Sequence, residues 1–453
     1  MGGGEERLLP KRVQGETRGM IMDKSNLPSP VRVNVVPFVS VLRDDKEIQG
    51  RIIEYMEELR KIQGFKFFLS PLGHQSLLQD SHCEHQDTDI TLPLVLSGGT
   101  ELEVLEFLAL QDGPTLILAH PSDNAPAAAL EVLPLLAADG HVARLIQATP
   151  GWQDELSRML NMFCTRIRMK SARIGVFGGR EIEVMQPWRL TKKVREVWGP
   201  RLVRFEVDEL IDAVREIDPE EAKDVAFEFA KGATCIFEPG EEILEGSAGV
   251  YLALKRFVQE YRLDAVTVKC FDLLQPCQNT GCYALARLSE EGVPAACEAD
   301  VLSCLGMLFI HELTSQPSFM ANPAQIDTKL GRLLLAHCTI PRTMTTAYRI
   351  RSHFESGIGT AIEGDVKPGP VTMARIGGRG LNEIFVARGR VIESDLSDDM
   401  CRTQITVELS DKAHVNHLLL SPLGNHHLVV EGDHLQAIEE FMGLFIKESR
   451  IFV

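Results

Sequence analysis

The chain has 453 residues, of which 44% are hydrophobic and 25% charged. That composition is typical of soluble globular proteins, and the length predicts about two or three domains. The net charge of −17, without a long run of Lys or Arg, argues against nucleic acid or an anionic membrane surface as a partner.

Targeting signals and cysteine usage indicate the compartment. No apolar run is long enough to cross a bilayer, and the N-terminus shows no signal-peptide core, so we expect a cytoplasmic protein without a membrane partner. The ten Cys include no CxxC pair, which favours reduced, buried thiols over a disulfide framework or a zinc site.

The first 170 residues predict a tail followed by an α/β domain. Residues 1–29 are rich in Gly, Arg and Glu and lack periodicity, which predicts a flexible tail. In 30–170, apolar strands alternate with amphipathic helices, and this alternation predicts a parallel, doubly wound sheet. The strands are expected at 31–39, 65–71, 92–98, 114–121 and 142–150, and the helices at 45–63, 100–110, 125–138 and 153–169.

A second α/β domain is predicted for 171–329, because a short strand again enters a Gly-rich turn at Gly178. Further strands are expected at 201–207, 264–274 and 293–300, and helices at 207–217, 220–231, 247–261, 283–291 and 301–313. After residue 329 the runs become short and β-type, separated by Gly, Pro and Asp. They predict a β-rich, antiparallel barrel-like C-terminal domain, 330–453, with a terminal helix at 433–448.

Two carboxylates stand at a predicted strand-to-helix junction in the second domain. Glu298 and Asp300 follow an apolar run and precede the helix 301–313, so they should lie at the carboxyl edge of a parallel sheet, where such sheets bind ligands. Asp300 also occupies an N-cap position, which is the simpler role. Asp272 follows the strand 264–270 and would share the same edge if the strands are parallel, although a capping or solvated acid is an equal alternative.

Imidazoles are the second polar feature, and they lie in the C-terminal domain. His337 ends an apolar strand, where a hydrogen-bonded core histidine is the more common role. His426 and His427 are adjacent on a predicted strand, so at most one should face a given pocket. Arg402 begins a strand and could simply pair with a nearby Asp. Together, carboxylates and imidazoles suit Mn²⁺, Mg²⁺ or Co²⁺ better than structural zinc.

Five stretches in the second half of the chain read AACEADVLSCLGMLFIHELTSQPSFMANP, LLLAHCTIPRTM, SHFESGIGTAIEG, CRTQITVEL and GNHHLVVEGDH. They resemble the L-fucose isomerase-like family, within the fucose/arabinose isomerase superfamily. The resemblance runs from about Asp264 to the C-terminus, and the first 260 residues share only the architecture. It implies a metal-dependent aldose–ketose isomerase, usually with Mn²⁺, that acts through a cis-enediol on a pentose or 6-deoxyhexose. It also implies a homo-trimer or homo-hexamer.

The resemblance also suggests roles for individual residues. Asp300 matches the metal-binding Asp of the acid-x-Asp motif, and His426 matches the metal-binding His, with His427 as the alternative. The family's second acidic ligand, which is also its acid–base residue, has no match in 275–288, so Glu298 or Asp272 would replace it. His337, Arg402 and Asn425 are then predicted to bind the sugar.

Because that acid lacks a match, a non-catalytic sugar-binding or regulatory protein on the same scaffold remains an alternative. A metal hydrolase is a weaker one, since no HExxH motif is present.

Overall fold

The computed structural model describes residues 30–40, 45–73, 88–111, 115–179, 187–395 and 397–452. The chain forms two compact units, the first comprising residues up to Gln153 except 140–142, and the second comprising 140–142 and Asp154 onward. Within the described residues, no helix has the length and apolar character to cross a membrane. The predicted tail, 1–29, lies outside the described residues.

The first unit contains a five-stranded parallel sheet in the order β2-β1-β3-β4-β5. Its strands are β1 (Val31–Phe38), β2 (Phe65–Leu69), β3 (Ile90–Val95), β4 (Thr115–Ala119) and β5 (Ala143–Gln147). Its helices are α1 (Asp45–Leu59), α3 (Glu101–Ala109) and α4 (Ala125–Ala138). The chain places β2 on one side of β1 and then places β3, β4 and β5 in turn on the other side. This change of direction is the doubly wound arrangement expected from the sequence.

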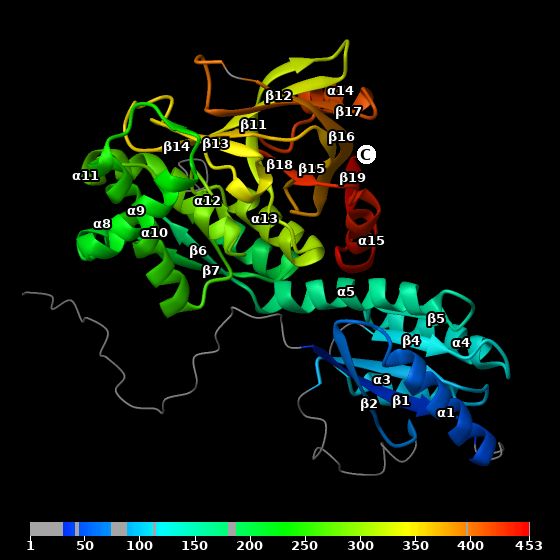
Figure 1. Ribbon diagram of the computed structural model, residues 1–453. Coiled ribbons are helices and arrows are strands. Elements are labelled where there is room, and N and C mark those ends of the chain that lie inside the picture. Colours follow the sequence, from blue (N-terminus) through cyan, green and yellow to red (C-terminus); the bar gives the residue numbers. More distant parts are fainter. Residues whose placement is uncertain are drawn as a thin grey trace, which may run out of the picture. The chain divides into compact units, whose positions relative to one another are not determined.

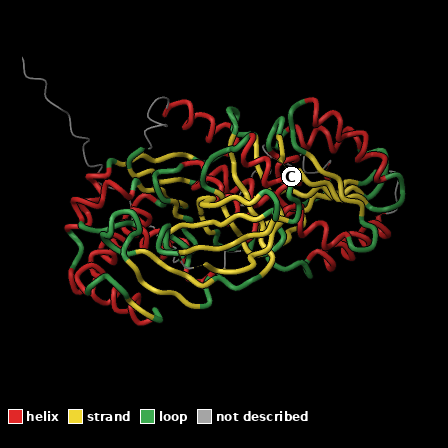
Figure 2. Tube along the Cα trace, turned by 90° about the horizontal axis from the view of Figure 1, so that it is seen from above, coloured by secondary structure: helices red, strands yellow, loops and turns green. Residues whose placement is uncertain are grey.

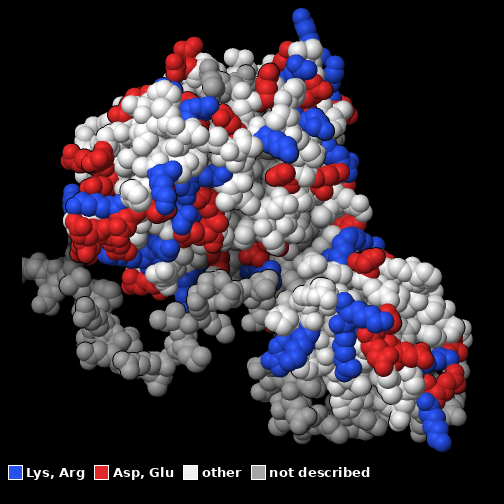
Figure 3. All heavy atoms as spheres, viewed as in Figure 1, with Lys and Arg blue, Asp and Glu red and all other residues white. Residues whose placement is uncertain are grey.

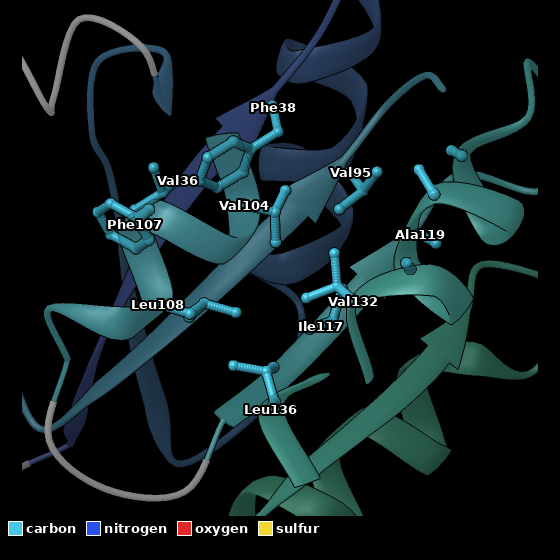
Figure 4. Close-up of a cluster of buried hydrophobic side chains, with 13 residues drawn as sticks. Val36, Phe38, Val95, Val104, Phe107, Leu108, Ile117, Ala119, Val132 and Leu136 are labelled. Atoms are coloured by element: carbon cyan, nitrogen blue, oxygen red, sulfur yellow. The ribbon is translucent and has the colours of Figure 1, made fainter. Parts of the chain in front are cut away.

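The core of the first unit explains why its strands are apolar on both faces. Every residue of β4 is buried, as expected for a central parallel strand covered by helices. Side chains of α3 and α4 pack onto one face of the sheet (Figure 4). The rings of Phe38 and Phe107 meet edge to face with centroids 5.5 Å apart.

The second unit contains a four-stranded parallel sheet in the order β10-β9-β6-β7. Its strands are β6 (Arg173–Phe177), β7 (Arg201–Phe205), β9 (Ala265–Val268) and β10 (Ala295–Ala296). Its helices include α5 (Trp152–Ser171), α7 (Pro187–Lys193), α8 (Val207–Arg215), α9 (Pro219–Gly232), α10 (Glu241–Tyr261), α12 (Cys282–Glu290) and α13 (Val301–Thr314). Helices are coloured red and strands yellow in Figure 2.

Helix α10 begins at Glu241, six residues before the predicted start at 247. In the structure Gly246 is needed for close packing, because a Cβ there would lie 2.7 Å from the Nδ2 atom of Asn279. Two glutamates, Glu241 and Glu242, stand in the first turn of the helix, where they interact favourably with its dipole.

The C-terminal strands form a closed, antiparallel six-stranded barrel, which confirms the predicted fold class. Its strand order is β15-β18-β11-β12-β17-β16, and β16 pairs back onto β15 (Figure 1). The barrel strands are β11 (Phe319–Asp327), β12 (Arg332–His337), β15 (Gly369–Gly377), β16 (Glu383–Asp395), β17 (Thr403–Leu409) and β18 (His427–Glu431). A seventh strand, β19 (Arg450–Phe452), pairs parallel to β16.

Two smaller features complete the second unit. A three-stranded sheet combines β8 (Cys235–Ile236), β13 (Ala347–Arg351) and β14 (Ala361–Asp365). Helices α14 (Ala413–Leu420) and α15 (Leu435–Phe445) belong to the C-terminal segment. The sequence predicted α15 but not α14, which is only eight residues long.

Helix α13 connects the parallel sheet to the barrel. Its residue Gly306 approaches strand β18 so closely that a Cβ would lie 2.6 Å from the Cδ1 atom of Leu428. The N-terminus of α13 follows β10 directly, so the same helix fixes the sheet edge against the barrel. This contact places the acidic motif beside the histidines of the barrel strands.

On the face of the molecule shown in Figure 3, acidic and basic side chains are interspersed. The exposed ion pairs of the described residues include that of Arg256 with Glu221 at 3.1 Å. Such pairs contribute little to stability.

Candidate active site

A strained turn presents the two carboxylates of the acidic motif. Strand β10 ends at Ala296, and both Glu298 and Ala299 adopt left-handed backbone conformations, with φ of 59° and 51°. Each such conformation costs roughly 1–2 kcal/mol for a residue with a Cβ. The Ala299 N–H donates to the carbonyl of Val268 on β9 at 2.9 Å, which ties the turn to the sheet edge. Strain held in place by surrounding structure is common at functional sites.

Asp300 is buried and serves two purposes at once. It caps α13, since its Oδ1 accepts the Ser303 N–H at 2.9 Å. Its Oδ2 accepts hydrogen bonds from the Ser303 hydroxyl at 2.8 Å and from the Arg375 guanidinium at 3.2 Å. The same Oδ2 lies 2.9 Å from Nδ1 of His426.

The ionised state of Asp300 follows from these contacts. Burial by itself would raise the pKa of this carboxyl, but the charge of Arg375, the contact with His426 and the Ser303 amide together hold the pKa well below its usual range. Asp300 is therefore a buried carboxylate whose negative charge is balanced mainly by Arg375.

His426 lies between the two carboxylates of the motif. Its Nδ1 faces Asp300, and its Nε2 is 3.4 Å from Oε1 of Glu298. Burial alone would lower the pKa of His426, but the hydrogen bonds to Asp300 and Glu298 outweigh it and raise the pKa. A carboxylate behind one ring nitrogen fixes the tautomer and orients the other nitrogen toward a ligand, as it does for metal-binding histidines.

Glu298, His337 and His426 form a group with the geometry of a metal site. One ligand atom from each lies within 4.8 Å of the others. Burial, and secondarily the neighbouring His426, lowers the pKa of His337 to about 3, so its imidazole stays neutral and keeps a lone pair available. One carboxylate oxygen and two imidazole nitrogens are a donor set that can hold a divalent cation.

A pocket opens beside this group. Its wall combines polar groups, two aliphatic or aromatic side chains and five thiols, and it is lined by Cys270, Phe271, Leu274, Thr280, Cys282, Cys297, Glu298, Asn322, His337, Cys338, His353, Glu355 and Cys401. The pocket therefore brings together the end of the parallel sheet, the start of α12 and residues of the barrel.

The other predicted site residues lie outside the pocket wall. Asp272 is paired with Lys269 at 3.1 Å, and its side chain is 41% exposed. Arg402 donates from Nε to the Ser352 carbonyl at 2.9 Å. The Asn425 amide donates to Oδ1 of Asn322 at 3.2 Å. Asn425 therefore contacts a residue of the pocket wall without being part of the wall itself.

His427 is buried in a different environment from His426. Its Nδ1–H donates to the Asn425 carbonyl at 3.0 Å, and its ring meets Phe385 edge to face with centroids 5.6 Å apart. Burial lowers the pKa of His427 to about 4. As the alternation of a strand requires, only one of the two histidines approaches Glu298.

Several residues of the site were not predicted to act there. Arg375 is the most important, because it balances the Asp300 charge from strand β15. A signal was present in the sequence, since Arg375 interrupts an otherwise apolar strand pattern. His353 and Asn322 belong to the motifs that carry the family resemblance, but nothing in their spacing indicated that they line the pocket.

The two adjacent histidines provide a first test of the site. If the group holds a divalent cation, replacing His426 by Gln should weaken cation binding about 100-fold or more, since a candidate ligand and its oriented donor atom are lost. Replacing His427 by Leu should change that affinity less than about threefold, because its ring packs against Phe385 and not against the metal group. Isothermal titration of Mn²⁺ measures both, with circular dichroism as the check of folding. Equal losses in the two variants would contradict the arrangement.

Comparisons with known proteins find curated sugar isomerases that are similar to this chain. No protein-family model matches the chain. The sulfoquinovose isomerase of Alkalicoccus urumqiensis is 22% identical over 303 residues, which cover 65% of this chain and 68% of that protein. The sulfoquinovose isomerase of Priestia megaterium is 21% identical over 313 residues, covering 66% and 69%, respectively. That of Clostridium sp. (strain MSTE9) is 23% identical over 228 residues, covering 48% and 50%.

These relatives and the site together define the class of the protein. It is an enzyme of the aldose–ketose isomerase type. Its similarity to these relatives, at 21–23% identity, is consistent with the fucose/arabinose-type sugar isomerase superfamily.

Proposed function

We propose that this enzyme is a metal-dependent isomerase that interconverts the aldose and ketose forms of a pentose or 6-deoxyhexose through a cis-enediol. The observation that supports this most directly is the convergence of Glu298, His337 and His426 within 4.8 Å. Asp300 adds to the support, because it holds His426 from behind at 2.9 Å. Within the superfamily, the motifs favour the L-fucose isomerase-like branch.

The donor set fits a divalent cation, and we propose Mn²⁺, with Mg²⁺ or Co²⁺ as substitutes. Glu298, His337 and His426 would hold it, while Asp300 acts as a positioning residue behind His426. The cation would polarise the sugar carbonyl and stabilise the negative charge that develops as a proton leaves the neighbouring carbon.

The protein's own groups would handle the proton. Glu298 is the carboxylate of the pocket that lies nearest the histidines, and we assign it the transfer of a proton between C1 and C2 as general base and then general acid. Asn322 would bind a sugar hydroxyl, with Asn425 fixing the amide orientation through their 3.2 Å hydrogen bond. Arg402 would support the segment that carries His353, through the Ser352 carbonyl.

The chemistry of the wall favours an uncharged sugar. Among the described residues, no Lys or Arg lines the pocket, and its carboxylates are Glu298 and Glu355. Phe271, Leu274 and the thiols offer an apolar surface suited to the methyl group of a 6-deoxy sugar. The relatives named as sulfoquinovose isomerases favour a second candidate, a sulfonated sugar, which would require a cation for its sulfonate group.

A substrate panel separates these candidates. The purified protein with Mn²⁺ is incubated with L-fucose, D-arabinose, L-arabinose and sulfoquinovose, and ketose formation is followed by NMR in D₂O, where deuterium entry at C2 or C1 reports the proton transfer. We expect turnover of a neutral sugar that stops on addition of EDTA. Turnover of sulfoquinovose alone would select the second candidate. Sugar binding without turnover and without sensitivity to EDTA would instead support a non-catalytic sugar-binding role.

We further propose a cytoplasmic homo-trimer or homo-hexamer. The superfamily resemblance supports this assembly, and multi-angle light scattering at micromolar concentration tests it. A monomer would contradict it.

A further inference from the structure

The thiols of the pocket wall are not used by the proposed reaction. Their sulfur atoms belong to Cys270, Cys282, Cys297, Cys338 and Cys401. These cysteines come from the ends of β9 and β10, the start of α12, and the residues after β12 and before β17. The sequence contains no CxxC pair, so the convergence of these cysteines on one cavity is a property of the fold.

Cys270 and Cys297 are in direct contact. The Sγ–H of Cys297 donates to Sγ of Cys270 at 3.1 Å. The topology supports the contact independently, because β9 and β10 are parallel neighbours with Ala296 opposite Thr267. The two cysteines therefore follow paired strands at the same edge of the sheet. Both are buried, with 4% and 5% of their surface exposed, and both line the pocket.

We propose that Cys270 and Cys297 form a peroxide-sensitive dithiol that closes to a disulfide and switches off the adjacent site. In the first step, the Cys270 sulfur attacks one oxygen of hydrogen peroxide, the O–O bond breaks, and a sulfenic acid and water form. In the second step, the Cys297 sulfur attacks that sulfenic sulfur, the S–O bond breaks, and a second water leaves with the disulfide. The two thiols lose two electrons and two protons, and the peroxide accepts them.

The position of Cys297 explains why closure would affect the site. Cys297 directly precedes Glu298, whose backbone is in the left-handed conformation. A disulfide requires sulfur atoms about 2.0 Å apart, so the pair must approach by about 1 Å from its present 3.1 Å. Because the turn that carries Glu298 begins at Cys297, we expect part of this approach to shift the turn and to weaken Mn²⁺ binding about tenfold or more, as when supporting residues of metal ligands are altered.

Cys338 offers an alternative route to a disulfide, since it contacts both Cys282 and Cys401. None of these three cysteines adjoins Glu298, whereas Cys338 directly follows His337. Identifying which cysteines are linked after oxidation therefore decides between the proposal and this alternative.

Peptide mapping tests the linkage without relying on catalysis. The full chain is treated with a small excess of hydrogen peroxide, remaining thiols are blocked with N-ethylmaleimide in denaturant, and digests are analysed by mass spectrometry before and after dithiothreitol. We expect a peptide pair linked through Cys270 and Cys297 that dithiothreitol separates. Absence of that pair, or a disulfide joining Cys338 to Cys282 or Cys401 in its place, would overturn the proposal.

Mn²⁺ titration of the oxidised and reduced protein gives the second readout. The reduced wild-type protein should bind Mn²⁺ about tenfold or more tightly than the oxidised wild-type protein. In Cys270→Ser and Cys297→Ser, the ratio of the two affinities should be close to one. Cys164→Ser is the matched control, because Cys164 is buried in α5 and does not line the pocket, so this variant should keep the wild-type ratio.

An undiminished ratio in Cys270→Ser would also overturn the proposal. Loss of sugar turnover on oxidation and the change in Mn²⁺ affinity rest on the proposed function, whereas the linked peptide does not.

Discussion

Replacing Glu298 by Gln should reduce Mn²⁺-dependent isomerisation by about 10³-fold or more, because the change removes the proposed acid–base carboxylate and an anionic metal ligand together. The shape of the side chain is kept, so the turn at 297–300 should fold as before. Two measurements separate the roles of this carboxylate. Metal titration reports the lost ligand, and exchange of the sugar C2 proton in D₂O at saturating Mn²⁺ reports the lost base.

Glu355→Gln is the matched comparison for the metal measurement. Glu355 is the other carboxylate of the pocket, but it does not belong to the group formed by Glu298, His337 and His426. Its replacement should leave the Mn²⁺ affinity within about threefold of the wild type. If Glu298→Gln retained both metal affinity and proton exchange, the proposed chemistry would be wrong.

The catalytic role predicted for Asp272 can be decided in the same assay. Its carboxylate pairs with Lys269 and is absent from the pocket wall. A loss of turnover in Asp272→Asn comparable to that of Glu298→Gln would assign the proton transfer to Asp272.

Replacing Arg375 by Met should lower the free energy of unfolding by about 3–5 kcal/mol. Arg375 and Asp300 are both buried, with 4% and 1% of their side chains exposed, and removal of one partner leaves the other charge without compensation in a poorly solvated position. The guanidinium also donates to the Ser303 hydroxyl, so the capped start of α13 loses a second contact. Urea unfolding followed by circular dichroism at pH 7 measures the loss.

Arg379→Met provides the control, since Arg379 is exposed in the turn after β15 and should change stability by less than about 0.5 kcal/mol. The double variant Asp300→Leu with Arg375→Met should recover part of the loss, because no buried charge remains. Its metal affinity should nevertheless stay at least about tenfold below the wild type, since His426 has lost the carboxylate that orients it. A single Arg375→Met variant as stable as the control would show that the pair contributes nothing to the fold.

Local sequence patterns were sufficient to predict most elements of the fold. Helix α4 begins and ends at the predicted residues, 125 and 138, and α13 differs by one residue at its end. The prediction was less accurate where tertiary packing determines the end of an element. Strand β10 is only two residues long, because the chain turns sharply at Cys297 to place Glu298, whereas the apolar pattern suggested a strand to residue 300.

The candidate site was also only partly predictable. The motif containing Glu298 and Asp300 and the adjacent pair His426 and His427 were recognisable from residue type and spacing. Which carboxylate lines the pocket, and which histidine approaches Glu298, depends on backbone conformation and strand direction. In the acidic motif, Glu298 and Ala299 both have left-handed backbone conformations. As a result the Glu298 side chain lines the pocket, whereas the Asp300 side chain caps helix α13.

The sequence by itself determined the alternation of strands and helices, the β-rich C-terminal segment and the presence of carboxylates and imidazoles at element ends, because these depend on neighbours within a few residues. Only the tertiary structure decided that Arg375 balances Asp300 across 75 positions, that His337 joins Glu298 and His426, and that five thiols line one cavity. Such contacts arise from barrel closure and from the packing of α13 against β18, and they leave no periodic trace in the sequence.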